Sequence, residues 1–133
     1  MSEIRIPWES WVVVCDGAKA LIMQNAGDNE LMNLQVHETL TQPNQADGMS
    51  GSAVGETSWH DQAEEDFLKR VAVKLDELVR EKHAKRIVLV APPKALGQIR
   101  PNLRADTQAS ITAEVAKDLT NFPVDQIERH LAA

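Results

Sequence analysis

The feature that most constrains the fold is a run of five apolar residues, Ile87–Ala91. A strand that is apolar at every position is typical of a strand covered on both faces, as in a sheet flanked by helices. The segment ahead of it has the apolar spacing of an amphipathic helix, carried by Phe67, Val71, Leu75 and Leu78. A capping-box-like Asp61-Gln-Ala-Glu64 predicts where that helix begins. A strand, a long helix and a second strand in this order indicate a right-handed crossover in an α/β fold.

The first forty residues predict an antiparallel meander. Trp11–Asp16 is expected to form a buried strand and Ala18–Met23 its partner, and Asp16-Gly17 at their junction is a strong signal for a hairpin with a type I′ turn. A third strand is expected where Met32, Leu34 and Val36 alternate with polar residues. We therefore expect three sequential strands joined by short turns.

The second half of the chain predicts two further helices and a fifth strand. Pro92-Pro93 ends the strand at Ile87–Ala91, and a short helix is expected over Lys94–Ile99. Ser110–Thr120 fits both a helix and a strand, and its Thr and Val residues favour the strand. Pro123 is suited to the first residue of a final helix. The prediction is one domain, residues 1–133, with a mixed five-stranded sheet and helices packed on it.

A Gly-rich segment separates the meander from the long helix. Residues 41–59 contain three glycines, and loops of this length inside a domain are usually mobile or functional. At its end, Trp59 and His60 are candidate interface residues, with core packing of Trp59 as the simpler interpretation. The segment Gly48-Met-Ser-Gly-Ser52 resembles a nucleophile elbow but lacks the final glycine of that motif. A hydrolase that uses Ser50 and His60 is therefore the weakest functional hypothesis.

Composition excludes several classes of site. The chain has 133 residues, a net charge of −6 and one cysteine, so it cannot form an intrachain disulfide, and broad nucleic-acid binding is not expected. The four histidines lack ligand spacing, and Asp16 is explained by its turn; no metal, cofactor or catalytic residue is predicted. No signal peptide or membrane span is recognisable, which favours the cytoplasm.

Basic residues concentrate in one segment of this acidic chain. From Lys85 to Arg104 there are five cations and no acidic residue. Lys94, Arg100 and Arg104 would form a binding site for phosphate or carboxylate groups if they converge beyond the fourth strand. The alternative is a solvated surface whose cations pair with acidic neighbours.

Three segments carry a resemblance to a known family. They are Trp11-Val-Val-Val-Cys-Asp-Gly-Ala-Lys-Ala20, then Leu89-Val-Ala-Pro-Pro-Lys-Ala-Leu-Gly97 with Arg100, and Lys117-Asp-Leu-Thr-Asn-Phe-Pro123. In this order they resemble the bacterial host attachment protein family, which is similar in fold to the middle domain of archaeal and eukaryotic peptide release factors and pelota-like proteins. The Gly-Gly-Gln motif of peptide release is absent.

The resemblance implies a function that the residues alone do not specify. We expect a non-enzymatic intracellular interaction protein needed for attachment of a bacterium to host cells, with an unidentified protein partner. The alternative is a ribosome- or RNA-associated factor whose cations contact phosphate. A small hydrolase that uses Ser50, His60 or Asp16 is the third hypothesis.

Overall fold

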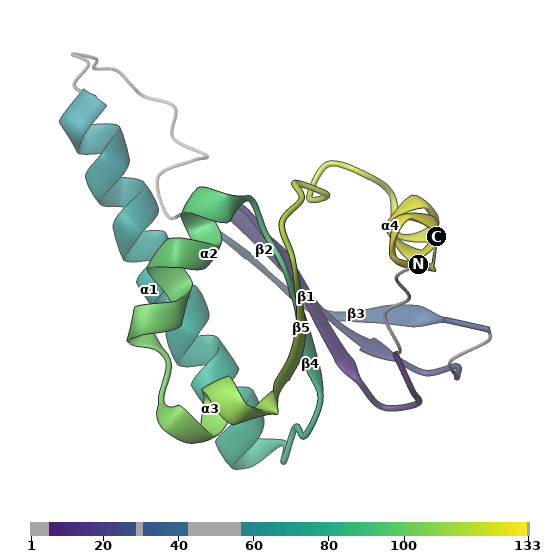
Figure 1. Ribbon diagram of the computed structural model, residues 1–133. Coiled ribbons are helices and arrows are strands. Elements are labelled where there is room, and N and C mark those ends of the chain that lie inside the picture. Colours follow the sequence, from purple (N-terminus) through teal and green to yellow (C-terminus); the bar gives the residue numbers. More distant parts are fainter. Residues whose placement is uncertain (1–5, 29–30, 43–56, 133) are drawn as a thin grey trace.

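The computed structural model describes residues 6–28, 31–42 and 57–132, and it confirms the predicted α/β class with a mixed five-stranded sheet (Figure 1). The strands are β1 (Trp11–Cys15), β2 (Lys19–Asn25), β3 (Leu34–Thr41), β4 (Ile87–Val90) and β5 (Ile111–Val115). The helices are α1 (Thr57–Glu81), α2 (Pro93–Ile99), the 3-10 helix η2 (Arg100–Asn102), α3 (Ala105–Ser110) and α4 (Val124–Ala132). Most of the predicted 41–59 loop lies outside the described residues.

The first strand lies at the centre of the sheet. The strand order is β3-β2-β1-β4-β5, with β1–β2 and β2–β3 antiparallel and β1–β4 and β4–β5 parallel. The meander therefore occupies one half of the sheet. Crossovers through α1 and then through α2, η2 and α3 build the other half. The carboxyl ends of β1, β4 and β5 therefore lie at the same end of the sheet.

Helices cover both faces of the sheet. On one face α1 and α2 enclose the larger part of the core, with Val13, Ile22 and Leu89 from the sheet against Phe67 and Leu75 of α1. Alternate residues of the same strands, such as Val12, Val14, Val88 and Val90, point to the opposite face, against Ile127 and Leu131 of α4. All four residues of β4 are buried, which confirms the prediction that this uninterrupted apolar strand is covered on both faces.

The β1–β2 hairpin forms as predicted, but its turn is not type I′. A type I′ turn needs positive φ at both central residues. Among the described residues other than glycine, only Glu9 and His83 have positive φ, and the φ of Gly17 does not lie in the left-handed region either. The turn is held instead by the Asp16 carboxylate, whose Oδ1 accepts hydrogen bonds from the backbone N–H groups of Ala18 (2.8 Å) and Lys19 (2.9 Å).

The predicted alternation of β3 changes phase halfway along the strand. A register shift opposite Ile22 and Met23 pairs Met23 with Val36 but Ile22 with Glu38. Leu34 packs on the α4 face and Leu40 on the α1 face, while Val36 is 46% exposed. The three predicted apolar positions precede this bulge: Met32 and Leu34 pack on the α4 face, whereas Val36, on the same side of the strand, is exposed and does not continue the buried face.

Local details of the helices also differ from prediction. α1 begins at Thr57, so Asp61 and Glu64 lie inside the helix and do not form a capping box. Acidic residues of α1 stand four positions before basic ones, as Asp66 does before Arg70, yet no such i,i+4 pair is among the ion pairs of the described residues. α3 was not predicted, and β5 takes up only the first half of the ambiguous 110–120 segment.

Candidate functional site

The three predicted basic residues are distributed over two ends of α2 and the segment that follows it. Lys94 lies in the first turn of α2, just beyond the carboxyl end of β4, and is exposed. Arg100 follows the last turn of α2 as the first residue of η2, and Arg104 directly precedes α3. The structure therefore brings Arg100 and Arg104 to one region and leaves Lys94 at the other end of α2.

Arg100 has an acidic partner that its own segment did not reveal. Its Nε lies 3.0 Å from Oε1 and 3.1 Å from Oε2 of Glu114 on β5, and its Nη2 also donates to Oε1. The hydrogen bonds to Glu114, followed by its negative charge, raise the pKa of Arg100 above its ordinary value. A guanidinium held in this bidentate way is already occupied by a carboxylate.

A recess lies beside this ion pair. It has a volume of about 380 Å³, and Arg100, Gln108 and Glu114 border it together with the apolar side chains of Leu103 and Ile111. Gln108 Nε2 donates to the carbonyl oxygens of Arg100 and Leu103, both at 3.2 Å. The recess is therefore bounded by η2 and α3 on one side and by β5 on the other.

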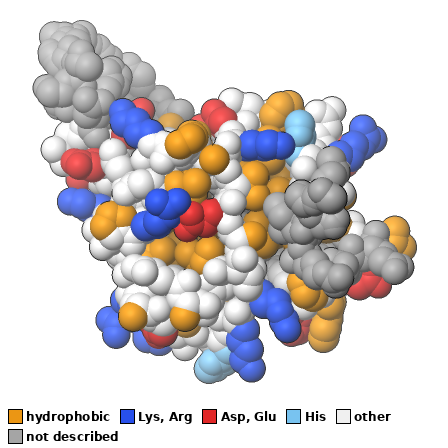
Figure 2. All heavy atoms as spheres, in the orientation of Figure 1, with side chains coloured by type: hydrophobic (Ala, Val, Ile, Leu, Met, Phe, Trp, Pro, Cys, Tyr) orange, Lys and Arg blue, Asp and Glu red, His pale blue; other side chains and the backbone are white. Residues whose placement is uncertain are grey.

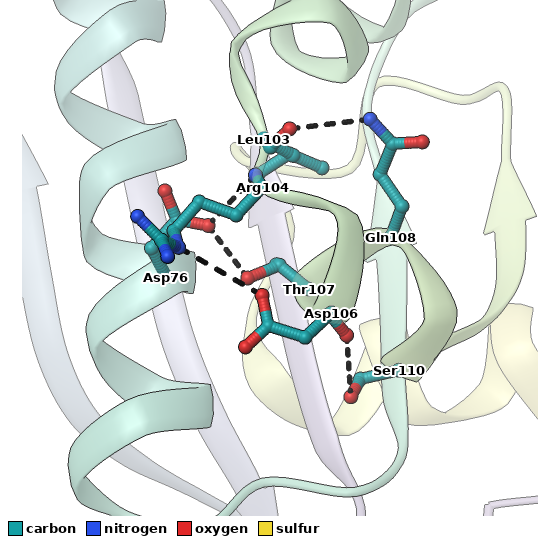
Figure 3. A network of polar contacts seen from close by, with 7 residues as sticks. All are labelled: Asp76, Leu103, Arg104, Asp106, Thr107, Gln108 and Ser110. Carbon is teal, nitrogen blue, oxygen red and sulfur yellow. Dashed lines mark hydrogen bonds and ion pairs between the residues drawn. The ribbon is translucent and has the colours of Figure 1, made fainter.

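Asp76 of α1 fixes the position of Arg104. Its Oδ1 accepts a hydrogen bond of 2.6 Å from the hydroxyl of Thr107, which is fully buried, and one of 3.2 Å from the Arg104 backbone N–H (Figure 3). The Arg104 guanidinium lies 3.9 Å from Oδ1 of Asp106 and is two-thirds exposed. One carboxylate of α1 thus anchors the start of α3, which carries no side-chain cap of its own.

Exposed cations gather where α1 passes into β4. We call the junction surface the set Arg80, Lys82, Lys85, Arg86 and Arg104. Arg80 lies one helical turn beyond Asp76, on the side of α1 that contacts Arg104. The chain turns sharply here because His83 takes a positive φ of 56° and Ala84 N–H donates to the Leu78 carbonyl.

The junction surface differs from the Arg100 site in its pairing. Its first four cations are exposed and take part in none of the ion pairs found among the described residues. Blue Lys and Arg side chains, with a histidine among them, lie along the lower end of the molecule in Figure 2. Arg104 and the Lys85–Arg104 segment were recognisable as basic from the sequence, whereas the contribution of Arg80 comes from α1 and depends on the fold.

At the opposite end of the parallel strands, a threonine hydroxyl lies between two carboxylates. Thr120 Oγ1 is 2.9 Å from Asp16 Oδ2 and 3.0 Å from Asp118 Oδ1, and Thr120 is 1% exposed. The contact ties the β1–β2 turn to the connection between β5 and α4. Two of the three segments that carry the sequence resemblance thus meet here, which their separation along the chain concealed.

The same two carboxylates influence the single cysteine. Burial first, and then the negative charges of Asp16 and Asp118, raise the pKa of Cys15 to about 12. Its thiol is therefore protonated at neutral pH and is a poor nucleophile. Within the described ranges, no three His, Cys, Asp or Glu side chains are grouped so that they could hold a metal ion.

The remaining predicted residues cannot be placed in a site. Ser50 lies outside the described residues, and so do the side chains of Trp59 and His60, whose backbone belongs to the first turn of α1. In the part of the chain that the structure describes, no helix has the length and apolar character needed to cross a membrane.

Comparison with known proteins supports part of the predicted resemblance. Residues 9–131 match the bacterial archaeo-eukaryotic release factor family 12. The chain is also 32% identical over 79 residues to the "Uncharacterized protein RP470" of Rickettsia prowazekii (strain Madrid E). That match covers 58% of this chain and 53% of the relative, about half its length. The release-factor-related part of the resemblance is confirmed, and the host attachment part stays a prediction.

Proposed function

The chain belongs to bacterial archaeo-eukaryotic release factor family 12, and from this premise we propose that it is a non-catalytic RNA-binding factor that associates with ribosomes in the cytoplasm. The observation that carries the proposal is the junction surface, four of whose five cations have no ion pair among the described residues, in a chain of net charge −6. Lys and Arg side chains without acidic partners are available to phosphates.

The position of these cations favours a phosphate backbone over a small anion. Arg80 and Lys82 lie at the end of α1, and Lys85 and Arg86 lead into β4, so the charges follow the chain around the turn between these two elements. An enclosed site for one phosphate would need several donors aimed at one point. A row of exposed cations instead suits successive phosphates of an RNA strand. Attachment to host cells, if the protein affects it, would then be an indirect effect of translation.

The test is the salt dependence of RNA binding with two matched double variants. K85A/R86A removes two cations of the junction surface, and K69A/R129A removes two exposed cations elsewhere. Both variants have the same net charge. We expect fluorescence anisotropy with a labelled stem-loop RNA to give a slope of log K against log salt that is shallower by about two for K85A/R86A.

The control variant separates a defined surface from general electrostatics. K69A/R129A should keep the wild-type slope and affinity, because its lost charges lie outside the junction surface. Equal losses in the two variants, or no measurable binding by the wild-type protein at low salt, would contradict the proposal. Co-sedimentation of the same proteins with ribosomes then tests the association itself.

A further inference from the structure

The outer side of β5 is an open edge of the sheet. β5 is the last strand in the order β3-β2-β1-β4-β5 and pairs only with β4. In Figure 1, β5 lies on the near side of the sheet, with α2 and α3 to one side and the connection to α4 to the other. No other segment of the described residues runs along this edge.

The direction of its backbone groups follows from the pairing with β4. The Val115 carbonyl accepts a hydrogen bond of 3.0 Å from Ala91 N–H, so the backbone groups of Val115 face β4. Main-chain groups alternate in direction along a strand, so those of Glu114 face away from β4. The pairing shifts register at Thr112, whose hydroxyl donates to the Ile87 carbonyl of β4. Glu114 therefore offers its N–H and C=O groups to an additional strand.

Few of the devices that protect an open edge are present here. Proteins place proline, lysine or other charged side chains on such strands to prevent pairing with another chain. β5 reads Ile-Thr-Ala-Glu-Val, and its single charge, Glu114, is neutralised by Arg100. The register shift falls at Thr112, between the pairs Ile87–Ile111 and Val88–Ala113, and leaves the pairing of Glu114 and Val115 with β4 regular.

We propose that a second copy of this chain pairs with β5 in antiparallel orientation, so that the two sheets become continuous in a twofold-symmetric dimer. Charge restricts the register. Glu114 opposite Glu114 of the second copy would oppose like charges, which is destabilising. A twofold axis at Ala113 avoids this contact, because it places Glu114 opposite Thr112.

Charge complementarity supports a second copy as the occupant. In this register the Arg100–Glu114 pair of each copy lies on the same face of the joined sheet, close to the pair of the other copy. Each guanidinium then lies near two carboxylates and each carboxylate near two guanidiniums. The added strand also covers part of the recess floored by Leu103 and Ile111, which removes apolar surface from water.

Two charge-reversal variants test the dimer by sedimentation velocity over a wide range of protein concentration. R100E carries two acidic groups at the edge and E114R carries two basic ones, so each variant alone should stay monomeric. The wild-type protein should dimerise reversibly, an equal mixture of R100E and E114R should form a heterodimer, and the double variant R100E/E114R should again self-associate. Circular dichroism confirms that each variant is folded.

The amide of Glu114 provides an independent readout in the unaltered protein. Its hydrogen exchange should slow by about tenfold or more as dimers form, whereas exchange at Val115, whose N–H faces β4, should not depend on concentration. A wild-type protein that is monomeric at every concentration overturns the proposal and leaves the edge to a peptide of another protein. So does a mixture of folded R100E and E114R that fails to associate.

Discussion

The two ends of the parallel strands use their charges differently. At the carboxyl end, Asp16 accepts hydrogen bonds from two backbone N–H groups and from Thr120, so its carboxylate joins three parts of the chain. At the amino end, four of the five cations of the junction surface take part in none of the ion pairs found among the described residues. Charged residues that maintain the fold therefore differ from those available for binding in whether they have hydrogen-bond or ion-pair partners, more than in their charge.

The contrast is sharpest between Asp76 and Arg80, which lie one turn apart on α1. D76A should lower the free energy of unfolding by about 3 kcal/mol, because it leaves the buried Thr107 hydroxyl and the Arg104 N–H without their acceptor. Urea denaturation measures the loss. R80A, which removes an exposed cation from the same helix, should leave stability nearly unchanged.

A double-mutant cycle shows whether the Asp76 effect comes from this contact. T107V removes the hydroxyl, and D76A added to T107V should then cost less than D76A alone. Additive effects of the two substitutions would mean that the carboxylate does not anchor α3 through Thr107.

Alkaline pH should weaken the carboxyl end through Cys15. The thiol ionises near pH 9 when unfolded but only at about pH 12 when folded, so stability is full below the lower value and falls as the pH rises between the two. The expected loss is about 1.4 kcal/mol per pH unit, or about 2 kcal/mol at about pH 10.5.

The comparison with C15A isolates this effect from other titrating groups. Urea denaturation of both proteins across the alkaline range should give a steeper decline for the wild type. Parallel declines would show that the Cys15 thiol ionises equally in the folded and unfolded states.

Thr120 should make the smallest of these contributions. T120V keeps the shape of the side chain but removes the donor shared by Asp16 and Asp118, so we expect a loss of about 1 kcal/mol in the free energy of unfolding. Thermal denaturation with T120S as the control, which retains the hydroxyl, measures it. Equal midpoints for T120V and wild type would remove this hydroxyl from the features that stabilise the carboxyl end.

The sequence predicted the sheet because its strands are strongly patterned. The uniform apolar run at β4 and the Asp16-Gly17 hairpin signal each depend on local residues, and both elements formed. α3 escaped prediction because its anchor, Asp76, comes from α1, far away along the chain. The phase change of β3 is likewise a property of the pairing between two strands.

The site was less predictable than the fold because pairing of charges is a spatial property. The Lys85–Arg104 segment contains no acidic residue, yet Glu114 from the next strand occupies Arg100. The Asp16–Thr120 contact joins residues 104 positions apart. The sequence shows which residues are charged, whereas the topology of the fold determines which of these charges lie close together.

The central place of β1 has a consequence for the order of folding. β1 can pair with β2 through a short turn, but Trp11 pairs with Ile87 on its other side, so about 75 residues must be closed into a loop. During synthesis the meander can therefore form while one side of β1 is still uncovered. Completion waits for α1 and β4, and this distant pairing should limit the folding rate.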